Sequence, residues 1–245
     1  MNKVYFTEEQ NSEEALKNAL RKALSIISDE SEINTIILLF PSLTIANHVL
    51  SGVLPSLTKG KRCGHFDNPP CGIQVETLKC FSPSIQHVLI PVFVTEKEMK
   101  GFEDEWYARI WIVVPYNYNN MEKWLQVHSA ESVSTGQVVT LNSTLDERVI
   151  NAIEWLGATS YPNEGFGHPL DLNRLKCMAN ALATIDVDLD YYSVLHYCIT
   201  HGINHDGGRK IADHFVNARI KRFKTDGNYP LSFLTEMMST KHYRI

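Results

Sequence analysis

The sequence predicts an α/β protein with a Rossmann-like, mostly parallel sheet and helices on both faces, followed by an all-helical C-terminal domain. Up to about residue 142, short apolar runs alternate with amphipathic segments. Runs such as TIILLF and HVLIPVFV have the length and composition of strands that are covered on both faces. After residue 142 only helical periodicity remains. We therefore predict a Rossmann-like domain over residues 1–142 and a helical domain over residues 143–245.

Each element of the first domain follows from its own pattern. The predicted strands are the short or alternating apolar runs at 3–6, 35–40, 72–81, 87–94, 108–115 and 136–141. The predicted helices are the segments between them that have a helical stripe or a capping residue at their start, namely 11–28, 42–54, 95–106 and 117–130. Residues 58–71 are rich in Gly and Pro and are predicted to be a loop. The order strand, helix, strand favours a parallel sheet.

The second domain contains only helical patterns. We expect helices at 143–157, 170–185, 188–202, 206–224 and 231–239. The segment ATSYPNEGFGHP, at 158–169, is a Gly/Pro loop between the first two of these helices. No internal repeat and no low-complexity tract is present.

Composition excludes several classes of protein. The chain has 245 residues, a formal net charge of −5 and 44% hydrophobic residues, which is ordinary for a globular protein and too acidic for a nucleic-acid binder as a whole. No apolar run approaches the roughly 20 residues that a membrane-spanning helix needs. The first 20 residues lack the apolar core of a signal peptide, and the cysteine count of 5 is odd. We expect a cytoplasmic protein without membrane contact and without disulfides.

Part of the first 57 residues resembles a known domain. The segments VYFTEE, SEEALKNALRKAL and TIILLFPSLTIANHVL are similar to the C-terminal domain of pyruvate kinase. The resemblance covers less than a quarter of the chain and contains no specific motif. It implies the alternation of strands and helices, and neither an activity nor site residues.

Polar side chains follow several predicted strands. In open parallel sheets, ligands bind beyond the carboxyl ends of the strands, where helix N-termini favour anions. The ligand-binding candidates there are Ser42, Thr44, Thr95, Asn117, Asn119 and Asn120. The alternative is that each of them only caps a helix. Neither a G-x-G-x-x-G nor a P-loop motif is present, so we predict no bound cofactor.

Two groups of residues have the chemistry of metal ligands without the required spacing. Cys63, His65, Cys71 and Cys80 could bind zinc, but they lack a C-x₂-C pair. His205 and Asp206 resemble the His-Asp pair of the HD-type metal phosphohydrolases, but no further His and Asp stand at convincing distances. We favour a structural role for both groups and predict no metal. Asp206 would then cap the following helix.

A basic segment stands out from the acidic chain. Residues 189–224 carry a formal net charge of +3, while the remainder carries −8. Six basic residues lie in the predicted helix 206–224 and are candidates for contact with a macromolecular partner, with a protein favoured over a nucleic acid: Arg209, Lys210, Arg219, Lys221, Arg222 and Lys224. The alternative is a solvated helix end, where cations are favoured by the helix dipole.

The loop 161–169 holds the best candidates for acid–base catalysis, Glu164 and His168. An interdomain elbow is the competing interpretation. Because no set of residues forms a catalytic signature, we lean towards a non-catalytic protein. The favoured function is an interaction or regulatory protein whose C-terminal domain engages a macromolecular partner. The alternative is a protein or enzyme that binds a small anionic ligand, such as a nucleotide or a phosphorylated metabolite, at the strand ends.

Overall fold

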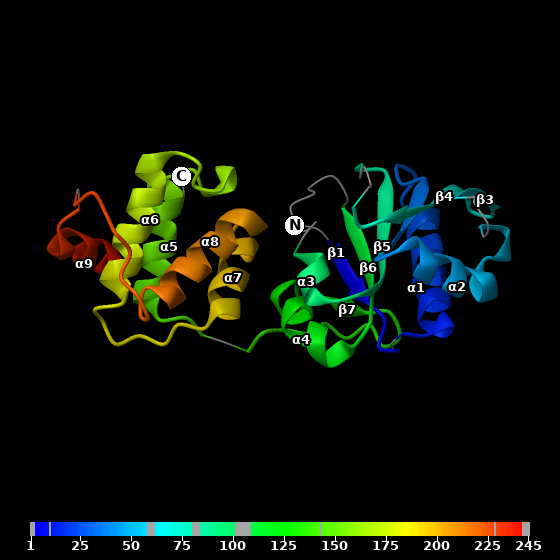
Figure 1. Cartoon of the computed structure of the whole chain (residues 1–245), viewed down its shortest axis with the longest axis horizontal. Helices are drawn as coiled ribbons and strands as arrows, with labels where there is room; N and C mark the ends of the chain where they lie inside the picture. The colour runs from blue at the N-terminus through cyan, green and yellow to red at the C-terminus, as the bar shows by residue number, and fades with distance from the viewer. Residues whose placement is uncertain are drawn as a thin grey trace. The chain divides into compact units, whose positions relative to one another are not determined.

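The structure, a computed structural model, describes residues 3–9, 11–57, 62–79, 84–100, 109–142, 144–227 and 229–241. The chain forms two compact units, Met1–Thr140 and Leu141–Ile245 (Figure 1). From the sequence we placed the boundary after residue 142. The two units are called unit 1 and unit 2 below.

Unit 1 contains a seven-stranded sheet with the order β3-β4-β2-β5-β6-β1-β7. Its strands are β1 (Lys3–Phe6), β2 (Thr35–Phe40), β3 (Cys63–Asp67), β4 (Pro70–Thr77), β5 (His87–Val94), β6 (Ile110–Pro115) and β7 (Glu131–Ser132). Every pairing is parallel except that of β3 with β4. The chain is therefore an α/β protein with a mostly parallel sheet, as predicted.

The strand order differs from that of a Rossmann fold in one position. Numbered in chain order, the six mutually parallel strands lie in the order 3-2-4-5-1-6, whereas a Rossmann fold has the order 3-2-1-4-5-6. In this chain the first strand lies between the fifth and the sixth strand, whereas in a Rossmann fold it lies at the centre of the sheet. Strands β2 and β5 are neighbours in the sheet. The next parallel strand in the sequence after β2 lies on one side of this pair, and the next strand after β5 lies on the other side. A topological switch point therefore lies between these two strands.

Helices cover both faces of the sheet (Figure 1). On one face, α1 (Glu13–Asp29) and α2 (Leu43–Val53) pack on residues such as Ile36, Leu38 and Ile90. On the other face, α3 (Glu96–Met99) and α4 (Tyr118–Val127) pack on alternate residues of the same strands. Burial on both faces explains why β2, β5 and β6 are continuous apolar runs.

Two predictions for unit 1 are wrong. Residues 58–71 were predicted to be a loop, but Cys63–Asp67 pairs with β4 as an exposed antiparallel edge strand. The strand predicted at 136–141 is not formed. Only Val138 bridges to Glu131, and β7 lies earlier in the chain. Val138 is 51% exposed, so this apolar residue does not belong to a buried strand.

The described part of unit 2 contains helices and no strand. Its helices are α5 (Glu147–Thr159), the 3₁₀ turn η2 (Pro162–Glu164), α6 (Pro169–Leu182), α7 (Tyr191–Thr200), α8 (His205–Asn217) and α9 (Leu231–Ser239). The predicted helix 206–224 is too long, because α8 ends at Asn217. The side chains of Arg219 and Arg222 donate hydrogen bonds to the backbone carbonyls of Val187 and Asn180. These bonds hold the following segment against the end of α6 rather than on the axis of α8.

Glycines bring α8 close to its neighbours. A Cβ atom at Gly207 would overlap the carbonyl group of Pro162, and one at Gly208 would lie 3.0 Å from Leu195 Cδ1 and 3.1 Å from Cys198 Cβ. The adjacent glycines thus have a packing role at the start of the helix. None of the helices in the described segments is long and apolar enough to cross a membrane.

Candidate functional site

Unit 1 has a cavity of about 530 Å³ at the carboxyl ends of its strands, which we call the strand-end cavity. Its described lining comes from the segment after β1, from α2, from β5 and from the residue after β6. The lining residues are Asn11, Glu13, Thr44, Ile45, His48, Val49, Phe93 and Tyr116. Segments that are far apart in the sequence therefore meet at one place, beside the switch point between β2 and β5.

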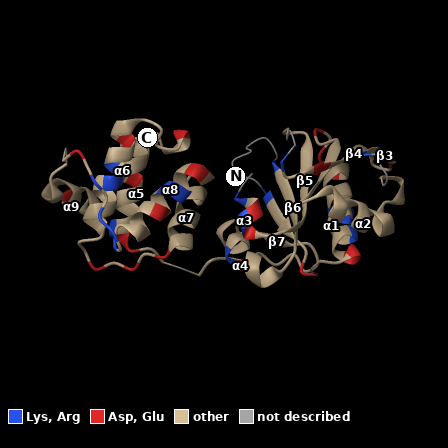
Figure 2. Cartoon of the chain, viewed as in Figure 1, with Lys and Arg blue, Asp and Glu red and all other residues tan. Residues whose placement is uncertain are grey.

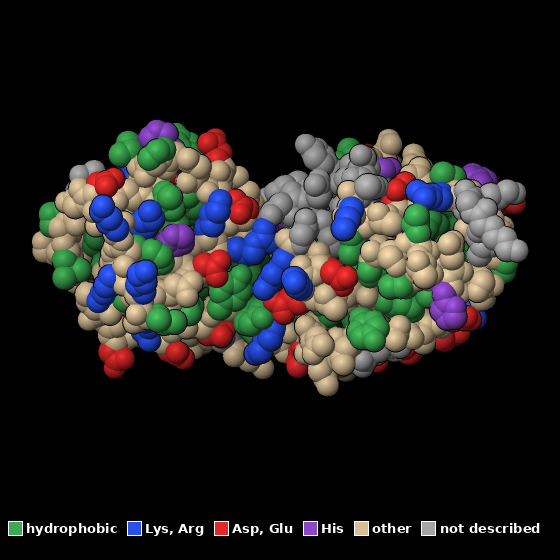
Figure 3. All heavy atoms as spheres, in the orientation of Figure 1, with side chains coloured by type: hydrophobic (Ala, Val, Ile, Leu, Met, Phe, Trp, Pro, Cys, Tyr) green, Lys and Arg blue, Asp and Glu red, His purple; other side chains and the backbone are tan. Residues whose placement is uncertain are grey.

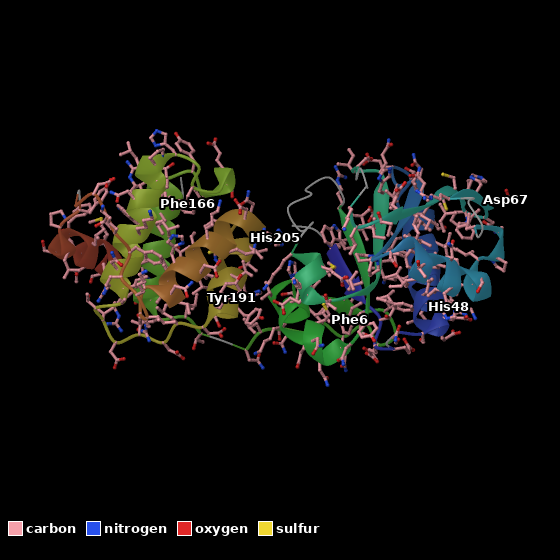
Figure 4. The ribbon with its side chains drawn as sticks, in the orientation of Figure 1. Phe6, His48, Asp67, Phe166, Tyr191 and His205 are labelled. Carbon is pink, nitrogen blue, oxygen red and sulfur yellow. The ribbon has the colours of Figure 1, made fainter. Side chains whose placement is uncertain are left out.

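One face of α2 forms much of the cavity wall. Ser42 caps this helix, since its Oγ accepts a hydrogen bond of 3.3 Å from Ile45 N. Thr44 and His48 are one turn apart and so share a face, while Val49 also packs on the core. Figure 4 shows His48 on α2, with its side chain at the edge of unit 1 where the strands end.

Two residues of the lining have unusual backbone angles. Asn11 has a φ of 44° and Phe93 a φ of 56°, in the left-handed region that residues other than glycine seldom adopt. Phe93 lies at an irregularity in the register of β5 with β6, which falls between Val92 and Val94. Such strain persists where the surrounding structure imposes it, and it is concentrated at binding sites. At Phe93 this backbone conformation brings a residue of an otherwise buried strand to the wall of the cavity.

Three polar residues of the strand-end cavity, Glu13, Thr44 and His48, lie at different positions along α2. Glu13 begins α1, and its carboxylate lies against Gly52, where a Cβ atom would overlap it. Thr44 is in the first turn of α2, eight residues before Gly52, which corresponds to about 12 Å along the helix. His48 lies midway. The cavity therefore has a carboxylate at one end and a helix N-terminus at the other.

The predicted ligand-binding residues are divided between this cavity and helix caps. Thr44 lines the cavity. Ser42, Thr95 and Asn117 cap α2, α3 and α4, and Thr95 forms a complete capping box with Glu98. Asn119 donates its backbone N–H to Asn117 Oδ1 over 3.0 Å. Asn119 and Asn120 are exposed in the first turn of α4.

Sequence reasoning missed Glu13, His48, Phe93 and Tyr116 as cavity residues. The rule that ligands bind at strand carboxyl ends would have found Glu13, had it also been applied to the segment after the first strand. Tyr116 directly follows β6 and was open to the same argument. His48 and Phe93 carried no such signal, since one depends on the rotation of α2 and the other on the irregularity in β5.

The four zinc candidates are not brought together by the described structure. Cys63 and His65 lie on the same face of β3, and both are exposed. Cys71 pairs with Phe66 in the register of the hairpin, so its side chain lies on the opposite face, in the core. Burial raises the pKa of the Cys71 thiol, which disfavours the thiolate. Cys80 lies outside the described residues.

The second pair of metal candidates helps to build the start of α8. Asn204, and not Asp206 as predicted, caps this helix by accepting a hydrogen bond of 2.8 Å from Gly207 N. Asp206 pairs with Lys210 at 3.0 Å. His205 is in the same first turn and is labelled in Figure 4. Within the described segments, no three His, Cys, Asp or Glu side chains form a group that could hold a metal ion.

The catalytic candidates Glu164 and His168 have different structural positions. His168 caps α6, and its Nδ1 accepts a hydrogen bond of 3.3 Å from Leu170 N. Glu164 ends η2 and lines a second cavity of about 530 Å³. This helix-end cavity, as we call it, is lined by residues 157–164, Gly202 and Ile203. His168 is not among its lining residues.

Several of the basic residues that are candidates for partner binding instead form hydrogen bonds or ion pairs within unit 2. Lys210 Nζ donates to the carbonyl oxygen of Gly165 over 2.7 Å in addition to its ion pair with Asp206. Arg219 and Arg222 donate to backbone carbonyls, as described above. Arg209 is half-buried, whereas Lys221 and Lys224 are exposed. Figure 2 shows the basic residues along the segment that follows α8.

Comparison of the chain with protein-family models, with curated proteins and with solved structures finds no match in any of the three.

Proposed function

We propose that unit 1 binds a small anionic organic ligand of nucleotide size in the strand-end cavity. The observation that carries this proposal is the convergence of Glu13, α2, Phe93 and Tyr116 on one cavity beside the switch point of a parallel sheet. Ligand sites in doubly wound sheets are found at this position. A volume of about 530 Å³ is within the ordinary range of small-molecule sites.

The distribution of chemistry along the cavity supports this class of ligand. The first turn of α2, which contains Thr44, offers backbone N–H groups to an anionic group, and His48, one turn further on, offers an imidazole as a hydrogen-bond partner. Ile45, Val49 and Phe93 give an apolar wall for a ring. The carboxylate of Glu13, at the other end, accepts hydrogen bonds from hydroxyl or amino groups. These three features match phosphate, base and sugar hydroxyls.

The test is a thermal unfolding screen of the full chain with mononucleotides, sugar phosphates and other acidic metabolites at millimolar concentration. A ligand present at 100 times its Kd stabilises the folded state by about 2.7 kcal/mol, which corresponds to a Tm increase of about 5–10 °C. His48→Ala and Tyr116→Ala should reduce this shift. The matched control is Asn47→Ala, since Asn47 is exposed on the same helix and does not line the cavity.

If the screen gives no shift with any of these compounds, the proposal is refuted. If a compound shifts the Tm equally in wild type, His48→Ala and Tyr116→Ala, it binds elsewhere and the strand-end cavity is not the site.

A second candidate function is contact of unit 2 with an acidic macromolecular partner, and one feature favours it. Ile220 is 83% exposed and is flanked by Arg219, Lys221, Arg222 and Lys224. On the face drawn in Figure 3, however, the basic side chains of unit 2 are separated by other residues. We expect Lys221→Glu with Lys224→Glu to elute from a heparin column at lower salt than wild type, because a partner site for polyanions would lose two of its charges. Unchanged elution would leave this segment as solvated surface.

A further inference from the structure

We propose that strand β3 pairs with β3 of a second copy of the chain, in antiparallel orientation about a two-fold axis beside His65. Strand β3 is the outermost strand on one side of the sheet and pairs with β4 on its inner side (Figure 1). A strand with unpaired backbone groups on its outer side is a template for another strand. No residue of β3 is in the described lining of the strand-end cavity, so this proposal does not depend on the function proposed above.

The hydrogen bonds of the hairpin determine which backbone groups of β3 face outwards. Val75 N donates to Arg62 O over 2.8 Å, so these two residues form a hydrogen-bonded pair of the antiparallel ladder. Hydrogen-bonded and non-hydrogen-bonded pairs alternate along such a ladder. Gly72, the partner of His65, accordingly donates its N–H to Asn34 O on the other side of β4, over 2.8 Å. The residues of β3 that direct their N–H and C=O groups away from β4 are therefore Cys63, His65 and Asp67.

This outer side of β3 is open in the part of the chain that the structure describes. The three residues are exposed, and no described group bonds to their outward N–H and C=O groups. The segment Cys63–Asp67 contains neither proline nor lysine, and its register with β4 has no bulge, so it lacks the common protections of an edge strand. The opposite edge differs, because Ser132 N of β7 donates to Gln137 O over 2.8 Å and Val138 bridges to Glu131.

The pattern of outward groups is complementary to itself. In an antiparallel copy related by a two-fold axis beside His65, this residue lies opposite His65 of the second copy, and Cys63 lies opposite Asp67 of the second copy. Every outward N–H and C=O group then has a partner, and none is left over. A two-fold interface requires such self-complementarity, because the same surface contributes both sides. This register is the reason for choosing a second copy as the occupant.

The side chains and charges of β3 also suit an antiparallel copy. In the same register, Phe66 lies opposite Gly64 of the second copy. Phe66 is half-buried against the core of its own chain, and the missing side chain of Gly64 leaves room for a ring, as in other strands where an aromatic residue covers an edge glycine. Arg62 precedes β3 and Asp67 ends it, so an antiparallel copy brings opposite charges together at both ends.

The association should be weak. Strand β3 has five residues, and the pairing of two such strands buries less than the roughly 1,200 Å² of a stable, specific interface. We therefore expect a Kd on the order of 100 µM, with the chain monomeric in dilute solution.

The experiment is sedimentation velocity of the full chain at concentrations from about tenfold below to about tenfold above this Kd. Wild type should change from monomer to dimer over this range. His65→Pro removes an outward N–H that β4 does not use, so it should weaken dimerisation at least tenfold while the Tm of dilute protein stays close to that of wild type. The matched control is His65→Ala, which keeps the backbone N–H and should dimerise like wild type.

A disulfide tests the register of the pairing. In a Cys63→Ser background, His65→Cys places two thiols across the two-fold axis with Cα atoms about 5.5 Å apart, a separation that a disulfide spans. Mild oxidation at high protein concentration should then give a covalent dimer. The matched control in the same background is Asn47→Cys, at an exposed position of α2, which should cross-link much less.

Several results would overturn the proposal. A wild-type chain that stays monomeric at every concentration would do so, and a His65→Pro variant that dimerises like wild type would show that the dimer uses another surface. Equal cross-linking at residues 65 and 47 would exclude the proposed register. Slow hydrogen exchange of the Cys63, His65 and Asp67 amides in dilute, monomeric protein would show that a different segment already covers this edge.

Discussion

Asn163 and Asn204 hold each other through two hydrogen bonds of 2.7 Å. The side-chain oxygen of Asn163 accepts from the backbone N–H of Asn204, and the side chain of Asn204 donates to the backbone carbonyl of Asn163. The same Asn204 side chain caps α8 through Gly207 N. One residue therefore links η2, the turn after α7 and the start of α8, and the stretch HGINHDGG is explained by this structural role.

We predict that Asn204→Ala destabilises unit 2 by about 2–3 kcal/mol. The substitution removes a helix cap and leaves the carbonyl of Asn163 without its partner. Urea unfolding of the full chain, followed by the indole NMR signal of Trp155 in α5, measures the change. Asn217→Ala, at the exposed end of the same helix, should change stability by less than about 0.5 kcal/mol. Equal effects of the two substitutions would contradict the role given to Asn204.

Gly207 should not tolerate a side chain. A Cβ atom there overlaps the Pro162 carbonyl group, so Gly207→Ala must push α8 away from η2. We expect a loss of about 2–3 kcal/mol, as for overpacking of a close contact. At Gly167 the nearest atom to a new Cβ, Glu164 O, would be 3.4 Å away, so Gly167→Ala is the control and should be nearly neutral. Calorimetric unfolding compares the two, and a neutral Gly207→Ala would show that the close approach is not needed.

The order of the buried elements could be predicted because a strand that is buried on both faces appears in the sequence as a continuous apolar run. Strands β2, β5 and β6 are covered on both faces and consist of continuous apolar runs, so their positions agree with the prediction to within two residues. Exposed strands leave no such pattern. Strand β3 contains Cys63, His65 and Asp67 on a solvent-facing edge and reads as a loop.

The candidate site could be predicted only in part. The rule that ligands bind at strand carboxyl ends pointed to the correct edge of the sheet and to Thr44. It could not separate Thr44, which lines the cavity, from Ser42, Thr95 and Asn117, which cap helices, because the same polar residue types serve both purposes. The end of α8 was missed for a related reason. Arg219 and Arg222 continue a helical pattern, but their tertiary bonds to carbonyls override it.

His214 should make the stability of unit 2 depend on pH. Burial lowers the pKa of this imidazole from its usual 6.5, and its Nδ1–H donates to the carbonyl oxygen of Lys210 over 2.7 Å. Asp213, Lys176 and Lys210 also act on it, with smaller effects than burial. Because the folded pKa is the lower one, the unfolded chain takes up the proton first as the pH falls. Stability is therefore lost as the pH falls from about 6.5 towards the folded pKa.

Thermal unfolding between about pH 7.5 and about pH 5, which spans the range in which an unperturbed imidazole changes its charge, should show this loss in wild type. His214→Gln should reduce the slope, whereas His65→Gln, at an exposed position of β3, should keep it. If the slope is the same in all three proteins, His214 does not contribute to it.

Two substitutions of Asn11 should distinguish the effect of backbone strain from the effect of its amide side chain on ligand binding in the strand-end cavity. Its φ of 44° is accessible to glycine without cost, is tolerated by asparagine and is unfavourable for alanine by about 1–2 kcal/mol. We therefore expect Asn11→Gly to be about as stable as wild type and Asn11→Ala to be less stable by about 1 kcal/mol in urea unfolding. Both substitutions remove the amide side chain. A ligand that contacts this amide should lose the same factor in affinity in both variants, measured by titration under conditions where each is folded. A loss seen in Asn11→Ala but not in Asn11→Gly would show instead that the backbone shape, and not the amide, supports the cavity.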